Sequence, residues 1–174
     1  WIKLNKVIKC FSNLPLFIDD TPNLSIQDIR LKTQRIFFEQ KKVGLIIIDY
    51  LQLLESPNSD SDNRVQELSK ITRSLKNIAR EFKVPIIALS QLSRNVENRF
   101  NKRPILSDLK ESGSIEQDAD LVLMLYRDSY YNESITEDDI TELIVAKHRN
   151  GSIGKIKLSF DAKITKFSNF SDNN

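Results

Sequence analysis

The sequence predicts an α/β fold in which helices flank a mostly parallel, twisted sheet, with an antiparallel hairpin at the C-terminal end. Two observations lead to this fold class. Short apolar runs, "VGLIIID", "VPIIALSQ" and "DLVLMLYR", are separated by helical patterns or polar connections. After residue 140, alternating apolar and polar segments flank Asn150-Gly151, which is typical of a β-hairpin. We interpret residues 1–174 as a single domain.

The first third of the sequence predicts alternating helices and strands. An opening helix ends at "SNLP", and "LPLFIDD" then predicts a short strand. Ser25, with Asp28 three residues later, predicts the capped start of a second helix that leads into "VGLIIID". Such β-branched runs are typical of parallel strands buried on both faces. The apolar residues of the opening helix are Trp1, Leu4, Ile8 and Phe11.

The middle of the sequence continues the alternation. Residues 55–63 predict a polar loop, and a helix follows near residues 64–82. "VPIIALSQ" predicts another buried strand, 91–119 a polar stretch with a little helix, and "DLVLMLYR" a third buried strand. The apolar stripe of the helix consists of Val65, Leu68, Thr72, Leu75, Ile78, Ala79 and Phe82.

Composition excludes several classes of protein. With 40% hydrophobic and 29% charged residues, the sequence is typical of a folded globular domain. Its apolar runs are shorter than the roughly 18 residues that a membrane span needs. The sequence has a single cysteine, which rules out an internal disulfide. With only one Cys and one His, a zinc site is not expected. We therefore expect a reducing compartment. Since the first residue is Trp1 rather than Met, we expect a piece of a longer product.

Asp49 interrupts the apolar stretch "LIIIDYLQLL" at the end of a predicted strand. Ligands of open α/β sheets bind at the carboxyl ends of the strands, where a carboxylate can hold Mg²⁺ beside nucleotide phosphates. The alternative is an acid that caps the next turn. The following strand also ends in polar residues, Ser90 and Gln91. Gln91 can sense a γ-phosphate or orient the attacking water, or it can simply precede a helix.

Lys147 and Arg149 lie two residues apart on a predicted strand, so both point to the same face while His148 points to the other. Two such cations form a solvated strand edge, or they contact a phosphate across a subunit boundary. Spacing alone favours the solvated edge. His148 has no triad partner in the pattern, and we interpret it as structural.

Several stretches together resemble the DnaB-type replicative DNA helicases, whose hexameric motors have a RecA-like P-loop NTPase core. They are "LPLFIDDTPNLSIQDIR", "LIIIDYLQLL", "SDNRVQELSKITRSLKNIAREFKVPIIALSQLSR", "KRPILSDLKESGSIEQDADLVLMLYRD" and "KHRNGSIGKIKLSF", in the family's order. The most specific parts are "DYLQL", "SQL" and "ESGSIEQDAD". The resemblance implies the C-terminal portion of such a motor domain, with the N-terminal part of the core missing.

The resemblance also implies roles for individual residues. Asp49 matches the Walker B acid that binds Mg²⁺, and Gln91 matches the phosphate sensor of the "SQL" motif. Lys147 and Arg149 match the basic pair that contacts the γ-phosphate bound by the neighbouring subunit, with Arg149 as the arginine finger. The central-channel loop that grips single-stranded DNA is matched by Lys110, Glu111, Ser112 and Gly113.

Charge alone would place DNA elsewhere, because acidic residues surround the channel-loop stretch. The basic strip is "RNVENRFNKR", residues 94–103, so Arg94, Arg99 and Arg103 are secondary DNA candidates. In the loop, backbone N–H groups near Ser112 and Gly113, together with Lys110, can hold one phosphate per subunit.

The sequence departs from the family's pattern in three ways. Lys110 stands where the family usually has Arg, which keeps the charge but loses the bidentate fork, and His148 stands where Gln is common. The P-loop, G-x-x-x-x-G-K-[ST], and the catalytic Glu lie upstream of the stretch that resembles Trp1. No glycine here is followed by Lys-Ser or Lys-Thr, so we expect the 174 residues alone not to hydrolyse ATP at a useful rate.

The resemblance implies a ring-shaped ATPase that uses ATP and Mg²⁺ to unwind DNA ahead of a replication fork. Its expected partners are single-stranded DNA, copies of itself in a homo-hexamer, a primase and a helicase loader, with no membrane. The AT-biased composition favours the plastid (chloroplast) stroma, with bacterial cytoplasm as the alternative. Another hypothesis is a P-loop-less, non-catalytic DNA-binding or interaction module. A recombination or circadian-type ATPase explains "SQLSR" and "SGSIEQDAD" less well.

Overall fold

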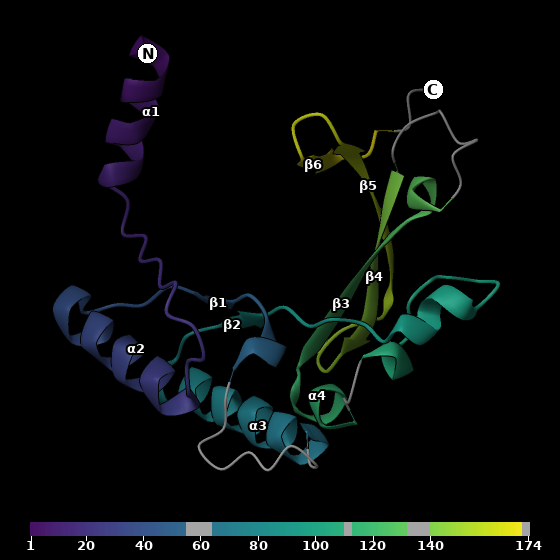
Figure 1. Cartoon of the computed structure of the whole chain (residues 1–174), viewed down its shortest axis with the longest axis horizontal. Coiled ribbons are helices and arrows are strands. Elements are labelled where there is room, and N and C mark those ends of the chain that lie inside the picture. The colour runs from purple at the N-terminus through teal and green to yellow at the C-terminus, as the bar shows by residue number, and fades with distance from the viewer. Residues whose placement is uncertain (55–63, 110–112, 132–139, 172–174) are drawn as a thin grey trace.

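The computed structural model describes residues 1–54, 64–109, 113–131 and 140–171 (Figure 1). The predicted loop at 55–63 lies outside these ranges. The helices are α1 (Ile2–Ser12), α2 (Ile26–Gln40), α3 (Arg64–Phe82) and α4 (Gly113–Asp118). The strands are β1 (Ile46–Ile48), β2 (Ile86–Ala88), β3 (Leu121–Arg127), β4 (Ile140–His148), β5 (Gly154–Asp161) and β6 (Lys166–Asn169). Single 3₁₀ turns lie at Leu51–Leu53, Arg94–Asn98, Leu106–Asp108 and Asp128–Tyr130. Among the described residues, no helix is both long and apolar enough to cross a membrane.

The opening helix is confirmed as α1, which stands away from the other elements in Figure 1. The strand predicted for "LPLFIDD" is wrong, because residues 15–20 have no regular secondary structure. An extended segment becomes a strand when its N–H and C=O groups pair with a neighbouring strand. In the described ranges, neither sheet includes this segment.

The capped helix is confirmed as α2. The backbone N–H of Asp28 donates to Ser25 Oγ at 3.2 Å, and the Ser25 N–H donates to the Asp28 carboxylate at 3.1 Å. This reciprocal pair satisfies amide groups that the first turn of a helix leaves unpaired. The apolar side of α2 packs against α3, where the Phe37 and Phe82 rings lie 5.7 Å apart.

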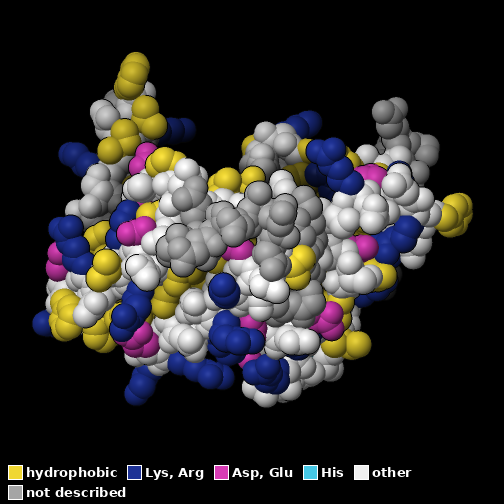
Figure 2. Space-filling view, turned by 60° about the horizontal axis from the view of Figure 1, so that its bottom comes forward, with side chains coloured by type: hydrophobic (Ala, Val, Ile, Leu, Met, Phe, Trp, Pro, Cys, Tyr) yellow, Lys and Arg dark blue, Asp and Glu magenta, His cyan; other side chains and the backbone are white. Residues whose placement is uncertain are grey.

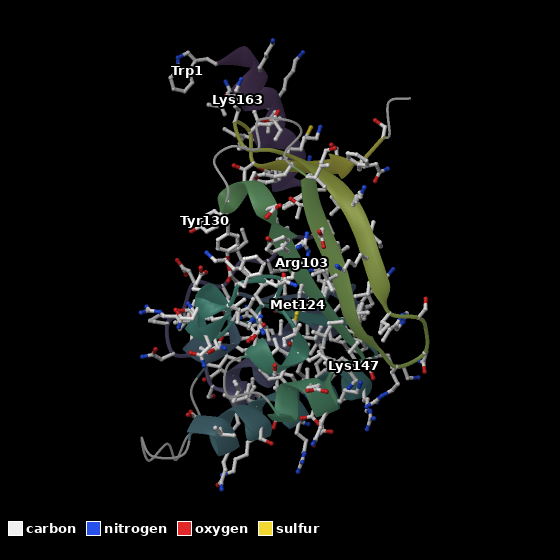
Figure 3. All side chains as sticks on the ribbon, turned by 90° about the vertical axis from the view of Figure 1, so that its right-hand side faces the viewer. Trp1, Arg103, Met124, Tyr130, Lys147 and Lys163 are labelled. Carbon is white, nitrogen blue, oxygen red and sulfur yellow. The ribbon has the colours of Figure 1, made fainter. Side chains whose placement is uncertain are left out.

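The hydrophobic core is built around α3. Leu68 and Ile78 are almost fully buried, as the predicted apolar stripe requires, and so is Ile71, which the predicted stripe did not include. They join a cluster that includes Ile48 on β1 and Met124 on β3, so helices and both sheets share one core. Figure 3 shows Met124 in the interior beside the antiparallel strands. Val65, predicted for the same stripe, is exposed at the start of the helix.

The α/β class is confirmed, and the described strands form two sheets. β1 and β2 pair in parallel, whereas β3, β4, β5 and β6 form a larger antiparallel sheet in that order. Burial of β1 and β2 on both faces is wrong for the described residues. The paired residues Ile47 and Ile87 are 63% and 50% exposed, since α2 and α3 cover the opposite face of these strands.

The third predicted strand, β3, is also covered on one face. Its residues alternate between buried Val122, Met124 and Tyr126 and exposed leucines between them. This period of two is what an antiparallel strand with one solvent-facing side shows. The run "DLVLMLYR" is almost entirely apolar, yet only one face of the strand enters the core.

The C-terminal hairpin is confirmed, but its turn is wider than a two-residue Asn-Gly turn. Val145 pairs with Gly154, and residues 149–153 connect β4 to β5. Gly151 does not have the positive φ that such a tight turn demands. Its small size matters instead, because a Cβ there would lie 2.4 Å from the His148 ring. The His148 ring therefore lies close to Gly151 in the turn.

Glu142 on β4 forms an ion cluster with Arg103 and Lys155. Arg103 Nε donates to both carboxylate oxygens at 3.0 Å, and Lys155 Nζ lies 3.4 Å away. The Arg103 guanidinium also stacks 4.6 Å from the Tyr126 ring centroid. The hydrogen-bonded Arg103, followed by Lys155, holds the pKa of Glu142 below its usual value. This cluster anchors the segment around Arg103 to the sheet.

We predict that Glu142→Gln lowers the free energy of unfolding by about 1–2 kcal/mol at neutral pH, because the Glu142 side chain is only 20% exposed and loses a charge-assisted fork. Urea unfolding measures this. A carboxylate with a lowered pKa stabilises the fold above its unfolded pKa of 4.5 and loses that contribution as the pH falls through its folded pKa. The difference between wild type and variant should therefore shrink on acidification.

Glu39→Gln is the matched control for this prediction. Glu39 pairs with Arg35 one turn away on α2, but the two side chains are 48% and 79% exposed. Exposed pairs contribute little, so we expect a change within about 0.5 kcal/mol. Equal losses in the two variants would contradict a special contribution of Glu142.

Candidate functional site

Asp49 and Gln91 lie at the same edge of the parallel strand pair. Ile48 pairs with Ala88, and the two strands stay bonded beyond their ends, with Leu89 N–H donating to the Ile48 carbonyl at 2.9 Å. Both chain segments leave the sheet here, so Asp49 and Gln91 follow neighbouring strand ends. Both residues are exposed. The expected placement at the carboxyl ends of parallel strands is thus what the fold produces.

Gln52 joins the two strand ends and was missed by sequence reasoning. Its side-chain Nε2 donates to Ser90 Oγ at 3.0 Å, and its Oε1 accepts the Gln91 backbone N–H at 3.4 Å. Gln52 lies in the 3₁₀ turn that follows Asp49, half-buried. A polar residue inside "LQLL" was the available signal, but its partners are 38 and 39 residues away in sequence.

The Asp49 carboxylate fits a Mg²⁺ ion held largely by other groups. It is exposed, and no hydrogen bond or ion pair within the described ranges occupies its oxygens. Those ranges contain no cluster of three metal-ligating side chains. Mg²⁺ at nucleotide sites typically uses one or two carboxylates, phosphate oxygens and water, so a single acid at this edge is compatible with that ion.

Lys147 and Arg149 are brought together at the end of β4, as their spacing predicts. Lys147 Nζ donates to the backbone carbonyls of Glu116 and Gln117, the latter at 3.3 Å. Arg149 Nη2 donates to the same Gln117 carbonyl at 3.3 Å. These carbonyls belong to the last turn of α4, where the partial negative charge of a helix end favours cations. Figure 3 shows Lys147 at the end of the antiparallel sheet beside the helices.

Asp120 is a second anionic partner of this pair. Its carboxylate lies 3.0 Å from Arg149 Nη1, and its backbone carbonyl accepts the Arg149 N–H at 2.8 Å. Lys76 on α3 bonds to the other carboxylate oxygen. That Lys76 hydrogen bond, with smaller contributions from the charges of Lys76 and Arg149, lowers the pKa of Asp120. Asp120 is therefore ionised at neutral pH and fixed from two sides.

The two groups of candidate residues lie on different elements, one after β1 and β2 and the other at the end of β4. Within the described residues, the hydrogen bonds and ion pairs of Lys147 and Arg149 go to α4 and Asp120, and none joins them to Asp49 or Gln91. A single chain thus presents an acid and an amide at one edge and a pair of cations elsewhere.

The DNA candidates divide into three groups. Lys110, Glu111 and Ser112 lie outside the described residues, and Gly113 is the first residue of α4. Within the basic strip, Arg99 is paired with the buried Asp108 and Arg103 with Glu142. The third arginine, Arg94, is exposed at the start of a 3₁₀ turn.

The surface charge is mixed on the face where α2 and α3 lie. Figure 2 shows lysine and arginine side chains on this face with acidic side chains among them. A net charge of +2 distributed in this way does not define an extended cationic surface. A phosphate site on this chain therefore has to be identified from local contacts and not from the net charge.

Sequence relatives of this chain are replicative helicases. A family described as "DnaB-like helicase C terminal domain" matches residues 1–169. A "Probable replicative DNA helicase" of Trieres chinensis is 71% identical over 170 residues, which cover 96% of this chain and 37% of that protein. "Replicative DNA helicase DnaB" of Geobacillus stearothermophilus is 51% identical over 169 residues, which cover 97% of this chain and 37% of that protein. The chain thus spans well under half the length of these relatives.

Solved structures agree with the sequence relatives. "The Structure Of A DnaB-Like Replicative Helicase And Its Interactions With Primase" superposes with a TM-score of 0.88 at 45% identity, covering 98% of this chain and 42% of that one. A solved structure described as an ATPase domain has the same score and identity and covers 98% and 60%. The RecA-like helicase ATPase fold expected from the resemblance is confirmed. The chain belongs to the DnaB-like helicase C-terminal domain family.

Proposed function

We propose that this chain is part of a replicative DNA helicase, a hexameric ring that couples ATP hydrolysis at subunit interfaces to movement on single-stranded DNA and duplex unwinding. The observation that carries the proposal is that the candidate residues form two half-sites on different elements of one chain, with no hydrogen bond or ion pair between them among the described residues. Asp49 and Gln91 share a sheet edge, whereas Lys147 and Arg149 are held at α4. Residues divided in this way are suited to complete one site between neighbouring copies in a ring.

In this proposal each half-site has its own task in ATP hydrolysis. Asp49 would bind Mg²⁺, and Gln91 contacts the γ-phosphate or the attacking water. Lys147 and Arg149 of one subunit neutralise charge that develops on the γ-phosphate bound by its neighbour. Asp49 is the residue that would hold Mg²⁺, which would supply neutralisation of the phosphate charge. Gln52 keeps the segment that bears Gln91 aligned with the segment that bears Asp49.

DNA contact is proposed for the stretch that leads into α4. Lys110, with backbone N–H groups near Ser112 and Gly113, holds one phosphate of single-stranded DNA per subunit, and Glu111 borders the same site. Arg94 is the exposed member of the secondary candidates. Arg99 and Arg103 already bind carboxylates of the same chain, which makes them weaker candidates for phosphate.

Further features of the whole protein follow the family. We propose a homo-hexamer with a primase and a loader as partners, since one structural relative is described with primase. We place the protein in the plastid stroma, supported by a relative from the alga Trieres chinensis, with bacterial cytoplasm as the alternative. Residues 1–174 are proposed to belong to one motor domain, because α2, α3, α4 and both sheets contribute to one core.

The alternative function is a non-catalytic DNA-binding or interaction module. Its basis is that these 174 residues contain no G-x-x-x-x-G-K-[ST] loop. Calorimetric titration of the isolated chain with ATP and Mg²⁺, and separately with single-stranded DNA, tests this alternative. Heat of ATP binding that depends on both Mg²⁺ and Asp49 would argue against a non-catalytic module, whereas binding of single-stranded DNA without nucleotide would favour that module.

We predict that Arg149→Ala in the full-length protein lowers kcat for ATP by at least about 10³-fold, since a finger acts on the transition state. The Kd for nucleotide should stay within about threefold. Steady-state phosphate release and equilibrium nucleotide binding measure the two quantities. Arg73→Ala, on the exposed side of α3, is the control and should behave as wild type.

Mixing subunits tests whether Arg149 acts on the neighbour. Asp49→Asn and Arg149→Ala subunits are each expected to be inactive alone, yet a mixed ring contains interfaces with an intact Asp49 on one side and an intact Arg149 on the other. Turnover should reappear on mixing. Retained turnover by Arg149→Ala alone would refute the finger role.

Lys110→Ala in the full-length protein should weaken binding to single-stranded DNA. Because one phosphate contact is removed from each subunit, the slope of log Kobs against log salt concentration should fall by about 0.7 for each subunit that contacts DNA, or by about 4 for a complete ring. Fluorescence anisotropy across a salt series measures it, with Lys70→Ala on α3 as the control for general charge loss. An unchanged slope in Lys110→Ala would remove this residue from the DNA site.

A further inference from the structure

The last turn of α4 and Asp120 together bind the cation pair, Lys147 and Arg149. Lys147 contacts the Glu116 and Gln117 carbonyls, and Arg149 contacts the Gln117 carbonyl and the Asp120 carboxylate. The backbone of Arg149 is fixed as well, through its N–H bond of 2.8 Å to the Asp120 carbonyl. Both the backbone and the guanidinium of Arg149 therefore contact one short segment, residues 117–120.

Asp120 is itself held in place from the opposite side. Lys76 extends from α3 to the carboxylate oxygen that Arg149 does not use. The Lys76 side chain is only 21% exposed, whereas Asp120 and Arg149 are 55% and 48% exposed. A mostly buried lysine thus fixes a half-exposed carboxylate, which in turn faces the guanidinium. Each oxygen of Asp120 has one cationic partner.

These contacts leave the guanidinium able to bind a phosphate. Arginine has five N–H donors; the hydrogen bond to the Gln117 carbonyl uses one on Nη2, and Nη1 faces the Asp120 carboxylate as an ion pair. The remaining donors have no partner among the described residues. A half-exposed ion pair contributes little to stability. Its main physical effect is to restrict a long, flexible side chain to one direction, and such preorganisation favours a transition-state contact.

We propose that Asp120 is a positioning residue for Arg149, aiming its guanidinium at the γ-phosphate bound by the neighbouring subunit while Lys76 holds the carboxylate still. Asp120 does not touch the nucleotide in this proposal and acts through Arg149 alone. The inference rests on the proposed function, since it requires Arg149 to be the finger. The proposal adds Asp120 to the cationic half-site. In the sequence alone, Asp120 is only one of several acids near the stretch that matches the channel loop.

A purely structural role is the competing explanation, because Asp120 also joins α3 to the end of β4. Asp118 provides the comparison. Its carboxylate accepts a hydrogen bond of 2.7 Å from Thr72 Oγ1 and so links α4 to α3. Asp118 makes no contact with Lys147 or Arg149 among the described residues. Loss of Asp118 loosens the same helices without altering the partners of the finger.

The experiment uses full-length hexamers and measures kcat and KM for ATP in the presence of single-stranded DNA. Asp120→Asn keeps the shape and one acceptor but removes the charge, and should lower kcat about tenfold with KM changed less than twofold. Lys76→Gln frees the carboxylate and should lower kcat in the same direction. Asp118→Asn should stay within twofold of wild type in kcat. Thermal unfolding and size-exclusion chromatography check that each variant forms rings.

The outcomes separate the explanations. An unchanged or increased kcat in Asp120→Asn overturns the proposal, and so does an equal fall in Asp118→Asn, which would indicate general loosening. If Asp120→Asn does not form rings, Lys76→Gln decides the matter by the same criteria. Arg149→Ala is measured in parallel. Normal turnover there means that the finger assignment has failed, whereas loss of turnover with a normal Asp120→Asn overturns the positioning role alone.

Discussion

Burial of one face of α3 is the constraint on which the other described elements depend. Leu68, Ile71 and Ile78 are nearly inaccessible to solvent, and each such aliphatic side chain contributes roughly 1.5–3 kcal/mol when it is fully buried. α3 contacts α2, β2 and α4, so it lies between the parallel strands and the helix that holds the cation pair. Both half-sites of the proposed ATPase are therefore positioned by the same helix.

The polar side of α3 is as important for the site as its apolar side. Thr72 bonds to Asp118, and Lys76 bonds to Asp120, each at the C-terminal end of α4 or just beyond it. The Arg149 guanidinium then meets Asp120 from the end of β4. Lys76 and Asp120 thus connect α3 to Arg149, the proposed finger, through successive side-chain contacts. Net charge does not reveal this arrangement, because acids and bases are nearly equal in number and are paired locally.

Much of the local structure could be predicted from the sequence. The capping box of Ser25 and Asp28, the stripe of α3 and the hairpin of β4 and β5 depend on neighbours in sequence, so residue spacing predicts them. The short strand at "LPLFIDD" was wrong, and so was burial of β1 and β2 on both faces. A strand and a second buried face both require partners that lie elsewhere in the chain or beyond it, and local hydrophobicity does not say whether they are present.

The sequence by itself determined the fold class, the placement of Asp49 and Gln91 after apolar strands, and the common side of Lys147 and Arg149, because periodicity sets which way side chains point. Tertiary structure decided what those side chains meet. Only folding brings Gln52 to Ser90, Lys76 to Asp120 and Asp120 to Arg149. Hydrogen bonds and ion pairs act over a few ångströms, and residues distant in sequence reach that range only after the core has formed.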